Sequence, residues 1–98
     1  MKITIEHTGE TKIIELASAS VLALENDLLD LPGWVEDAIT GKVDQCKKRM
    51  GRTEVERLKA DPDISTMPAT ADGLIESAVA APGYKNRVKR EEEDARMH

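Results

Sequence analysis

The N-terminal residues alternate between apolar and polar side chains with a period of two. Ile3 and Ile5 fall on one face, and Ile14 and Leu16 share a face after a turn-like cluster that contains a glycine. Alternation of this kind is typical of a half-buried β-strand. Residues 1–16 are therefore predicted to form a β-hairpin. Because two strands alone are only marginally stable in water, we expect them to gain either a strand from another chain or a covering helix.

Beyond the hairpin the apolar positions recur at steps of three and four residues, which is typical of amphipathic helices. One helix is predicted over 18–29, with Ser18 or Ser20 as its N-cap. The clearest periodicity covers 31–60 and predicts a long helix. Gly51 lies within this stretch, where a glycine favours a kink or an end.

Capping and helix-breaking residues set the remaining boundaries. Asp30 is predicted to cap the long helix, and the chain before Pro62 is predicted to end it. The loop that follows carries Ile64 and Met67, which we expect to hold it against the core. Thr70 then caps a shorter helix that ends before the Pro-Gly pair at residues 82 and 83.

The last segment, 84–98, is predicted to be a charged helix. Its opposite charges are spaced four residues apart, as in Arg87 with Glu91 and Lys89 with Glu93. The predicted fold class is therefore α+β, with an N-terminal β-hairpin followed by three or four α-helices. The chain is expected to be a single small domain, 1–98, made of a hairpin at 1–16, a helical body at 18–81 and the charged C-terminal helix at 84–98.

Composition indicates that the core of this chain is thin. Of 98 residues, 21 are Leu, Ile or Val, none is Phe, and one each is Trp and Tyr. A chain of this length buries only about 60–65 % of its unfolded surface, so its stability is expected to be marginal. A protein partner or a homo-oligomer would supply the missing burial. The net charge of −5 argues against nucleic acid as a partner.

The candidate chemical groups do not form a catalytic set. Cys46 lies on the apolar stripe of the long helix, far in sequence from His7 and His98, so we expect it to pack in the core. One cysteine with two scattered histidines lacks the spacing of a zinc site. Glu36 and Asp37 are interpreted as a solvated helix face. The chain is thus expected not to be an enzyme, with no metal and no cofactor.

No membrane association is expected either. The N-terminus lacks the long apolar region of a signal peptide. The longest uncharged apolar-rich stretch, 16–24, is far too short to cross a bilayer.

The candidate binding residues therefore point to protein partners. Strands with free backbone groups at their edges accept a strand from another chain, which makes the strand with Ile3 and Ile5 a candidate site. A lone tryptophan and a lone tyrosine anchor either the core or a partner pocket. The densest basic cluster is interpreted as a surface helix face or as a set of partner salt bridges rather than as phosphate contacts, because no aromatic residues are interleaved with it. The candidate partner-binding residues are Ile3, Ile5, Trp34, Lys47, Lys48, Arg49 and Tyr84.

Several short strings resemble a group of short proteins of tailed bacteriophages that are encoded among the structural genes, often on the tail side. The strings lie within about residues 30–90 and are Trp34-Val35, Gly41-Lys42-Val43, Cys46-Lys47-Lys48-Arg49-Met50, Ala60-Asp61-Pro62, Met67-Pro68-Ala69-Thr70 and Pro82-Gly83-Tyr84-Lys85-Asn86-Arg87. The resemblance implies a virion component or an assembly factor and carries no catalytic motif. The hairpin lies outside it.

The expected function is thus that of a non-enzymatic virion protein, associated with the tail or its fibres and acting through protein contacts. The alternative is an intracellular phage assembly chaperone, or an inhibitor of a host system, that is absent from the virion. The expected location is accordingly the virion or the host cytoplasm.

Overall fold

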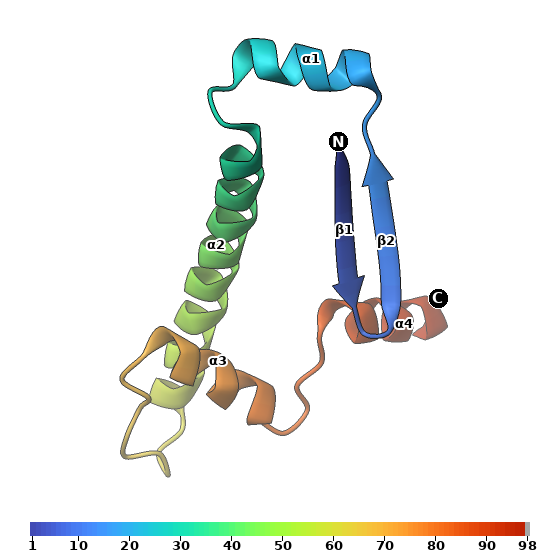
Figure 1. Ribbon diagram of the computed structural model, residues 1–98. Coiled ribbons are helices and arrows are strands. Elements are labelled where there is room, and N and C mark those ends of the chain that lie inside the picture. Colours follow the sequence, from blue (N-terminus) through green and yellow to red (C-terminus); the bar gives the residue numbers. More distant parts are fainter. Residues whose placement is uncertain (98) are drawn as a thin grey trace. The chain divides into compact units, whose positions relative to one another are not determined.

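The computed structural model describes residues 1–97 and has the predicted α+β class, with a hairpin followed by four helices among those residues (Figure 1). Its contacts divide the chain into two compact units, Met1–Thr40 and Gly41–His98, which are called the N-terminal unit and the C-terminal unit below. The elements are β1 (Lys2–His7), β2 (Glu10–Glu15), α1 (Ser18–Asp27), α2 (Leu31–Ala60), α3 (Ala71–Ala80) and α4 (Arg87–Met97).

The hairpin is antiparallel and closes through a two-residue turn. Ile3 lies opposite Ile14, and Thr4 lies opposite Ile13. The turn residues Thr8 and Gly9 have φ angles of 50° and 80°. Two consecutive positive φ values characterise a type I′ turn, whose twist matches that of the flanking strands. The predicted hairpin is confirmed.

The hairpin lacks a covering layer within the N-terminal unit. Eleven of the twelve strand residues are exposed, and Ile3 is half-buried. In the described part of the chain the sheet has two strands and no more. Within this unit no helix covers the hairpin, and completion by a strand from another chain stays a prediction.

Helix α1 corrects the predicted cap. Its N-cap is Ala17, which makes no side-chain hydrogen bond, and Ser18 and Ser20 both lie inside the helix. The extended N-cap residue, Ala17, precedes both serines, so neither hydroxyl is placed to serve as a cap. The predicted apolar face is present, because Val21 and Leu24 are half-buried.

Helix α2 is one continuous helix of 30 residues. Asp30 caps it as predicted, with Oδ1 accepting a hydrogen bond from the Gly33 N–H at 3.2 Å. The expectation of a kink or an end at Gly51 is wrong. Gly51 is buried, and a Cβ added there would lie 3.7 Å from a methyl carbon of Leu74 on α3. A Cβ would fit there at an ordinary contact distance, and the helix continues through Gly51 to its predicted end at Ala60.

The loop before α3 differs in part from expectation. Ile64 is half-buried, as predicted, but Met67 is 40 % exposed and does not hold the loop against a core. Asp61 instead shapes the turn locally, since its Oδ1 accepts a hydrogen bond from the Asp63 N–H at 2.9 Å. Such side-chain to backbone bonds fix a turn without burying apolar surface.

The N-cap of α3 gives a first prediction. The Thr70 Oγ1 accepts a hydrogen bond from the Gly73 N–H at 3.0 Å. Thr70→Ala is expected to lower the free energy of unfolding by about 1 kcal/mol, because a donor at the helix end loses its partner. Urea unfolding followed by circular dichroism measures the change. Thr66→Ala, at an exposed position of the same loop, is the matched control, and equal losses in the two variants would refute the capping role.

Helix α4 begins later than predicted. Asn86 accepts a hydrogen bond from the Lys89 N–H at 3.0 Å, so the helix starts at Arg87. The predicted pair of Arg87 with Glu91 forms at 2.9 Å. Glu93 pairs with Lys85 at 2.5 Å instead of with Lys89. The turn before the helix explains the difference, because it brings Lys85 back over the first turns of α4.

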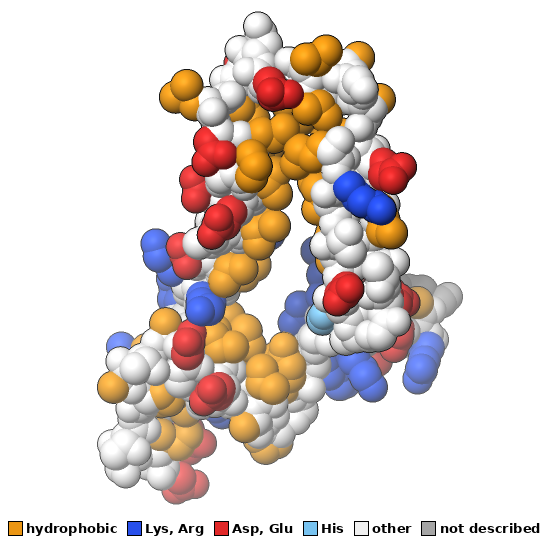
Figure 2. All heavy atoms as spheres, in the orientation of Figure 1, with side chains coloured by type: hydrophobic (Ala, Val, Ile, Leu, Met, Phe, Trp, Pro, Cys, Tyr) orange, Lys and Arg blue, Asp and Glu red, His pale blue; other side chains and the backbone are white. Residues whose placement is uncertain are grey.

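Apolar burial is very small, as the composition predicted. Among the described residues Leu31 and Leu58 are the buried apolar side chains, 8 % and 5 % exposed. Cys46 is exposed, so its predicted packing in the core is wrong. Figure 2 shows hydrophobic side chains at the surface over α1 and the first turns of α2. The exposed large apolar residues include Ile5, Ile13, Leu22, Leu29, Trp34, Ile39, Val43, Val79, Tyr84 and Val88.

Candidate functional site

The C-terminal unit contains a hollow of about 490 Å³. It lies among residues of α2, the end of α3, the turn that follows α3 and the start of α4. Four arginines and one glutamate carry the charges of its lining, a formal excess of three positive charges. The remaining lining is largely apolar and includes Met50, Ala78, Pro82 and Tyr84. This hollow is called the arginine hollow below, and its arginines are Arg49, Arg57, Arg87 and Arg90.

Glu54 is the buried polar residue at the base of the arginine hollow, with 2 % of its surface exposed. Its carboxylate accepts hydrogen bonds from Arg57 Nε at 2.6 Å and from Arg57 Nη2 at 2.7 Å. It also accepts one from the Ser77 hydroxyl at 2.5 Å. Glu54 thereby joins α2 to α3 with both carboxylate oxygens satisfied, as a buried carboxylate requires.

The charges at this network shift two ionisation equilibria. The Arg57 guanidinium, followed by the Ser77 hydroxyl, holds the pKa of Glu54 below its ordinary value against the opposing effect of burial. The Glu54 carboxylate in turn raises the pKa of Arg57. Glu54 is therefore a structural anion that neutralises one of the four arginines. Arg87 pairs with Glu91, and Arg49 and Arg90 have no ion pair among the described residues.

The other three arginines also line the hollow and make few hydrogen bonds or ion pairs. Arg87 pairs with Glu91 near the surface, and the Arg90 Nη1 donates to the backbone oxygen of Lys85 at 3.3 Å. The structure gives Arg49 no ion pair among the described residues. A planar guanidinium that still has free N–H donors is well suited to bind a carboxylate in a bidentate geometry.

The predicted basic cluster divides between two faces of α2. Lys47 forms an ion pair with Asp72 of α3 at 2.8 Å, and this hydrogen bond raises the pKa of Lys47. Lys47 thus joins two helices of its own unit, although its side chain is 43 % exposed. Lys48 is exposed on a second, smaller hollow, whereas Arg49 lines the arginine hollow. The three residues therefore do not form one continuous surface.

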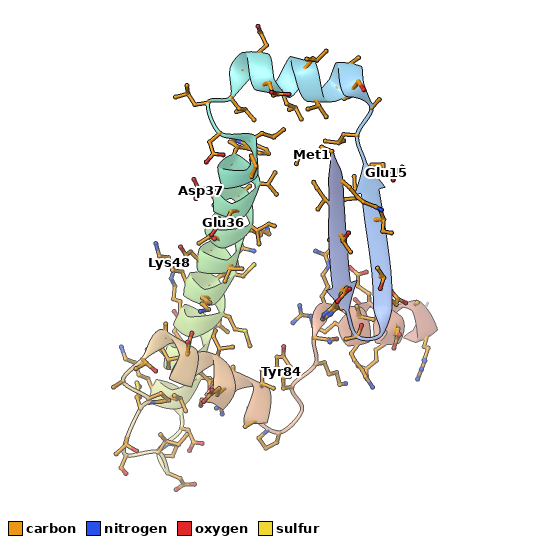
Figure 3. All side chains as sticks on the ribbon, viewed as in Figure 1. Met1, Glu15, Glu36, Asp37, Lys48 and Tyr84 are labelled. Carbon is orange, nitrogen blue, oxygen red and sulfur yellow. The ribbon has the colours of Figure 1, made fainter. Side chains whose placement is uncertain are left out.

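The two predicted aromatic anchors are both at the surface. Tyr84 is 40 % exposed, lines the arginine hollow and lies on the segment between α3 and α4 (Figure 3). Trp34 is 53 % exposed in the first turn of α2. It borders a shallow hollow of the N-terminal unit together with Leu29 and two acidic residues, Asp30 and Asp37. The aromatic rings are thus available to a partner rather than used in a core.

The hairpin edges also present free backbone groups. The Leu16 N–H donates to the Met1 oxygen at 2.9 Å, so these two residues form a hydrogen-bonded pair. Because such pairs alternate along an antiparallel ladder, the N–H of Thr4 on β1 and that of Ile13 on β2 point away from the partner strand. Of the candidate residues, Ile3 is half-buried and Ile5 is 47 % exposed on the same face of β1.

Sequence reasoning missed most of the arginine hollow. Glu54, Arg57, Arg87 and Arg90 were not among the candidates, although a usable signal was present. Cys46, Met50 and Thr53, like Arg49 and Arg57, recur at steps that bring residues to one helix face. The spacing did not indicate that the turn at residues 82–84 would also line the hollow.

No helix among residues 1–97 is long and apolar enough to cross a membrane. The same residues contain no group of three or more side chains that could hold a metal ion. Comparison of the chain with protein-family models, curated proteins and solved structures gave no match.

Proposed function

We propose that this chain is a non-enzymatic structural component of a tailed-bacteriophage particle, associated with the tail or its fibres and acting through protein–protein contacts. One observation carries the proposal. Helices α1, α2 and α3 each carry several apolar side chains, yet Leu31 and Leu58 are the only buried ones among the described residues. A monomer with so little buried apolar surface gains stability by contact with other chains.

The bacteriophage setting rests on the strings within residues 30–90 that resemble short tail-side phage proteins. The uncovered hairpin supports a role in assembly, because free strand edges bind a strand of a neighbouring chain. A partner strand would also complete a sheet that is marginal on its own. The edges of β1 and β2 and the two aromatic residues, Trp34 and Tyr84, are the contact surfaces of the proposed component.

Quantitative mass spectrometry of purified particles of the phage that encodes the chain tests the proposal. The expected result is a fixed copy number per particle, measured against a tail protein of known copy number. Abundance in the infected cell with absence from purified particles would overturn the proposal. That outcome would support the alternative, an assembly chaperone or an inhibitor of a host system.

A further inference from the structure

The two units of the chain carry opposite net charges. Residues 1–40 contain two lysines and eight acidic residues, a formal charge of −6. Residues 41–98 contain twelve basic and eleven acidic residues, a formal charge of +1. Within these residues, the lining of the arginine hollow carries a formal charge of +3. Oppositely charged surfaces on a single chain are complementary between two copies of it.

The N-terminal unit also offers an apolar anchor beside its acidic residues. Leu29 is fully exposed and Trp34 is 53 % exposed, and both border the shallow hollow that Asp30 and Asp37 share. This group of four residues is called the Trp34 patch below. Tryptophan and arginine are the side chains that most often dominate the binding energy of protein interfaces.

We propose that the Trp34 patch of one copy docks into the arginine hollow of a second copy. The Trp34 ring lies against the apolar lining formed by Met50 and Tyr84, where the neighbouring guanidinium groups attract its π face. Asp37 pairs with Arg49 and Arg90, which form no ion pair among the described residues. The proposal rests on the proposed function, since it names a second copy of this chain as one of the partners of a structural component.

The contact uses two different surfaces. In a pair of copies, one copy therefore keeps its arginine hollow free and the other keeps its Trp34 patch free. Such a heterologous contact builds a ring when the rotation closes and a filament when it does not. Trp34 would then be covered by a neighbouring copy rather than exposed to water.

A charge-swap experiment on the full-length chain tests the contact. One variant, Glu36→Lys with Asp37→Lys, makes the vicinity of the Trp34 patch basic. The second, Arg49→Glu with Arg90→Glu, makes the arginine hollow acidic. All four positions are exposed, and circular dichroism checks that each variant keeps its helix content. Figure 3 shows Glu36 and Asp37 projecting from α2.

Light scattering across a dilution series provides the readout. The wild-type chain is expected to associate, and raising the salt concentration from about 0.05 to about 0.5 M is expected to weaken association at least tenfold. Each variant alone is expected to associate at least tenfold more weakly than the wild type. An equal mixture of the two variants is expected to regain association, because each acidic surface again meets a basic one.

Reaction of Cys46 with iodoacetamide locates the contact. The exposed thiol lines the arginine hollow, so association of the wild type is expected to slow its alkylation several-fold under reducing conditions. A monomeric wild type at every concentration, a mixture that stays monomeric, or association that leaves the alkylation rate unchanged would each overturn the inference. None of these outcomes bears on the copy number in particles, so failure of the inference and failure of the proposed function are separate results.

Discussion

Replacement of Glu54 by glutamine is expected to lower the free energy of unfolding of the C-terminal unit by about 1–3 kcal/mol. The amide keeps the size of the side chain but places an NH₂ group where one carboxylate oxygen accepts hydrogen bonds from Arg57 and Ser77. The Arg57 Nη2 donor then loses its acceptor inside the buried network, and the charge that balances Arg57 is lost. Urea unfolding followed by circular dichroism measures the change.

Glu56→Gln is the matched control for this substitution. Glu56 lies on the same helix two residues away and is exposed, so its replacement is expected to change the free energy of unfolding by less than about 0.5 kcal/mol. Similar losses in the two variants would show that the Glu54 network does not hold α2 to α3.

The same network predicts how stability depends on pH. Because the folded-state pKa of Glu54 lies below its ordinary value, the carboxylate stabilises the fold fully above the pKa of the unfolded chain. This contribution is lost as the pH falls through the lowered folded-state value. Denaturation midpoints measured across the acidic range are therefore expected to fall less steeply for Glu54→Gln than for the wild type. Parallel curves would contradict the assignment.

The features that were predicted correctly from the sequence depend on interactions between residues that lie close together in the chain. Alternation around Ile3 and Ile5 specifies a hairpin, and Thr8-Gly9 supplies the positive φ angles that its turn requires. Asp30 and Thr70 cap helices through hydrogen bonds to residues three positions ahead. These interactions need no tertiary contact, so the local sequence determines them.

The features that sequence missed depend on a second segment of the chain. Gly51 lies inside a continuous helix with Leu74 of α3 beside it, and the sequence near Gly51 does not indicate that neighbour. Cys46 lies on the apolar stripe of α2 at a position that no other element buries, so periodicity predicted burial where the structure has an exposed thiol. Apolar periodicity indicates which face can be buried and does not indicate whether the partner lies in the same chain.

The small number of large apolar residues and the exposed apolar stripe of α2 together are the reason for proposing assembly surfaces on this chain. Leu31 and Leu58 mark the modest intramolecular core, while Trp34 and Tyr84 are exposed and are proposed to contact other chains. The basic cluster shows the limit of sequence reasoning here. Lys47 forms an ion pair within its own unit, and only Arg49 reaches the arginine hollow.

Blocking both hairpin edges is expected to remove the chain from phage particles if a neighbouring strand completes the sheet. Thr4→Pro and Ile13→Pro replace residues whose N–H groups point away from the hairpin. Proline is tolerated at such edge positions because it removes no hydrogen bond of the hairpin's own ladder, but it denies a donor to an added strand. The double variant is expected to fall at least tenfold in copy number per particle, measured by mass spectrometry.

Thr4→Val with Ile13→Val is the matched control, because it keeps both outward N–H groups and side chains of similar shape. Circular dichroism and the abundance of the variant in the infected cell confirm that the proline substitutions leave the chain folded and present. A proline variant that enters particles at the wild-type copy number would show that the hairpin edges are not used. The loss of the proline variant alone, with the valine variant retained, assigns the contact to backbone pairing rather than to the side chains.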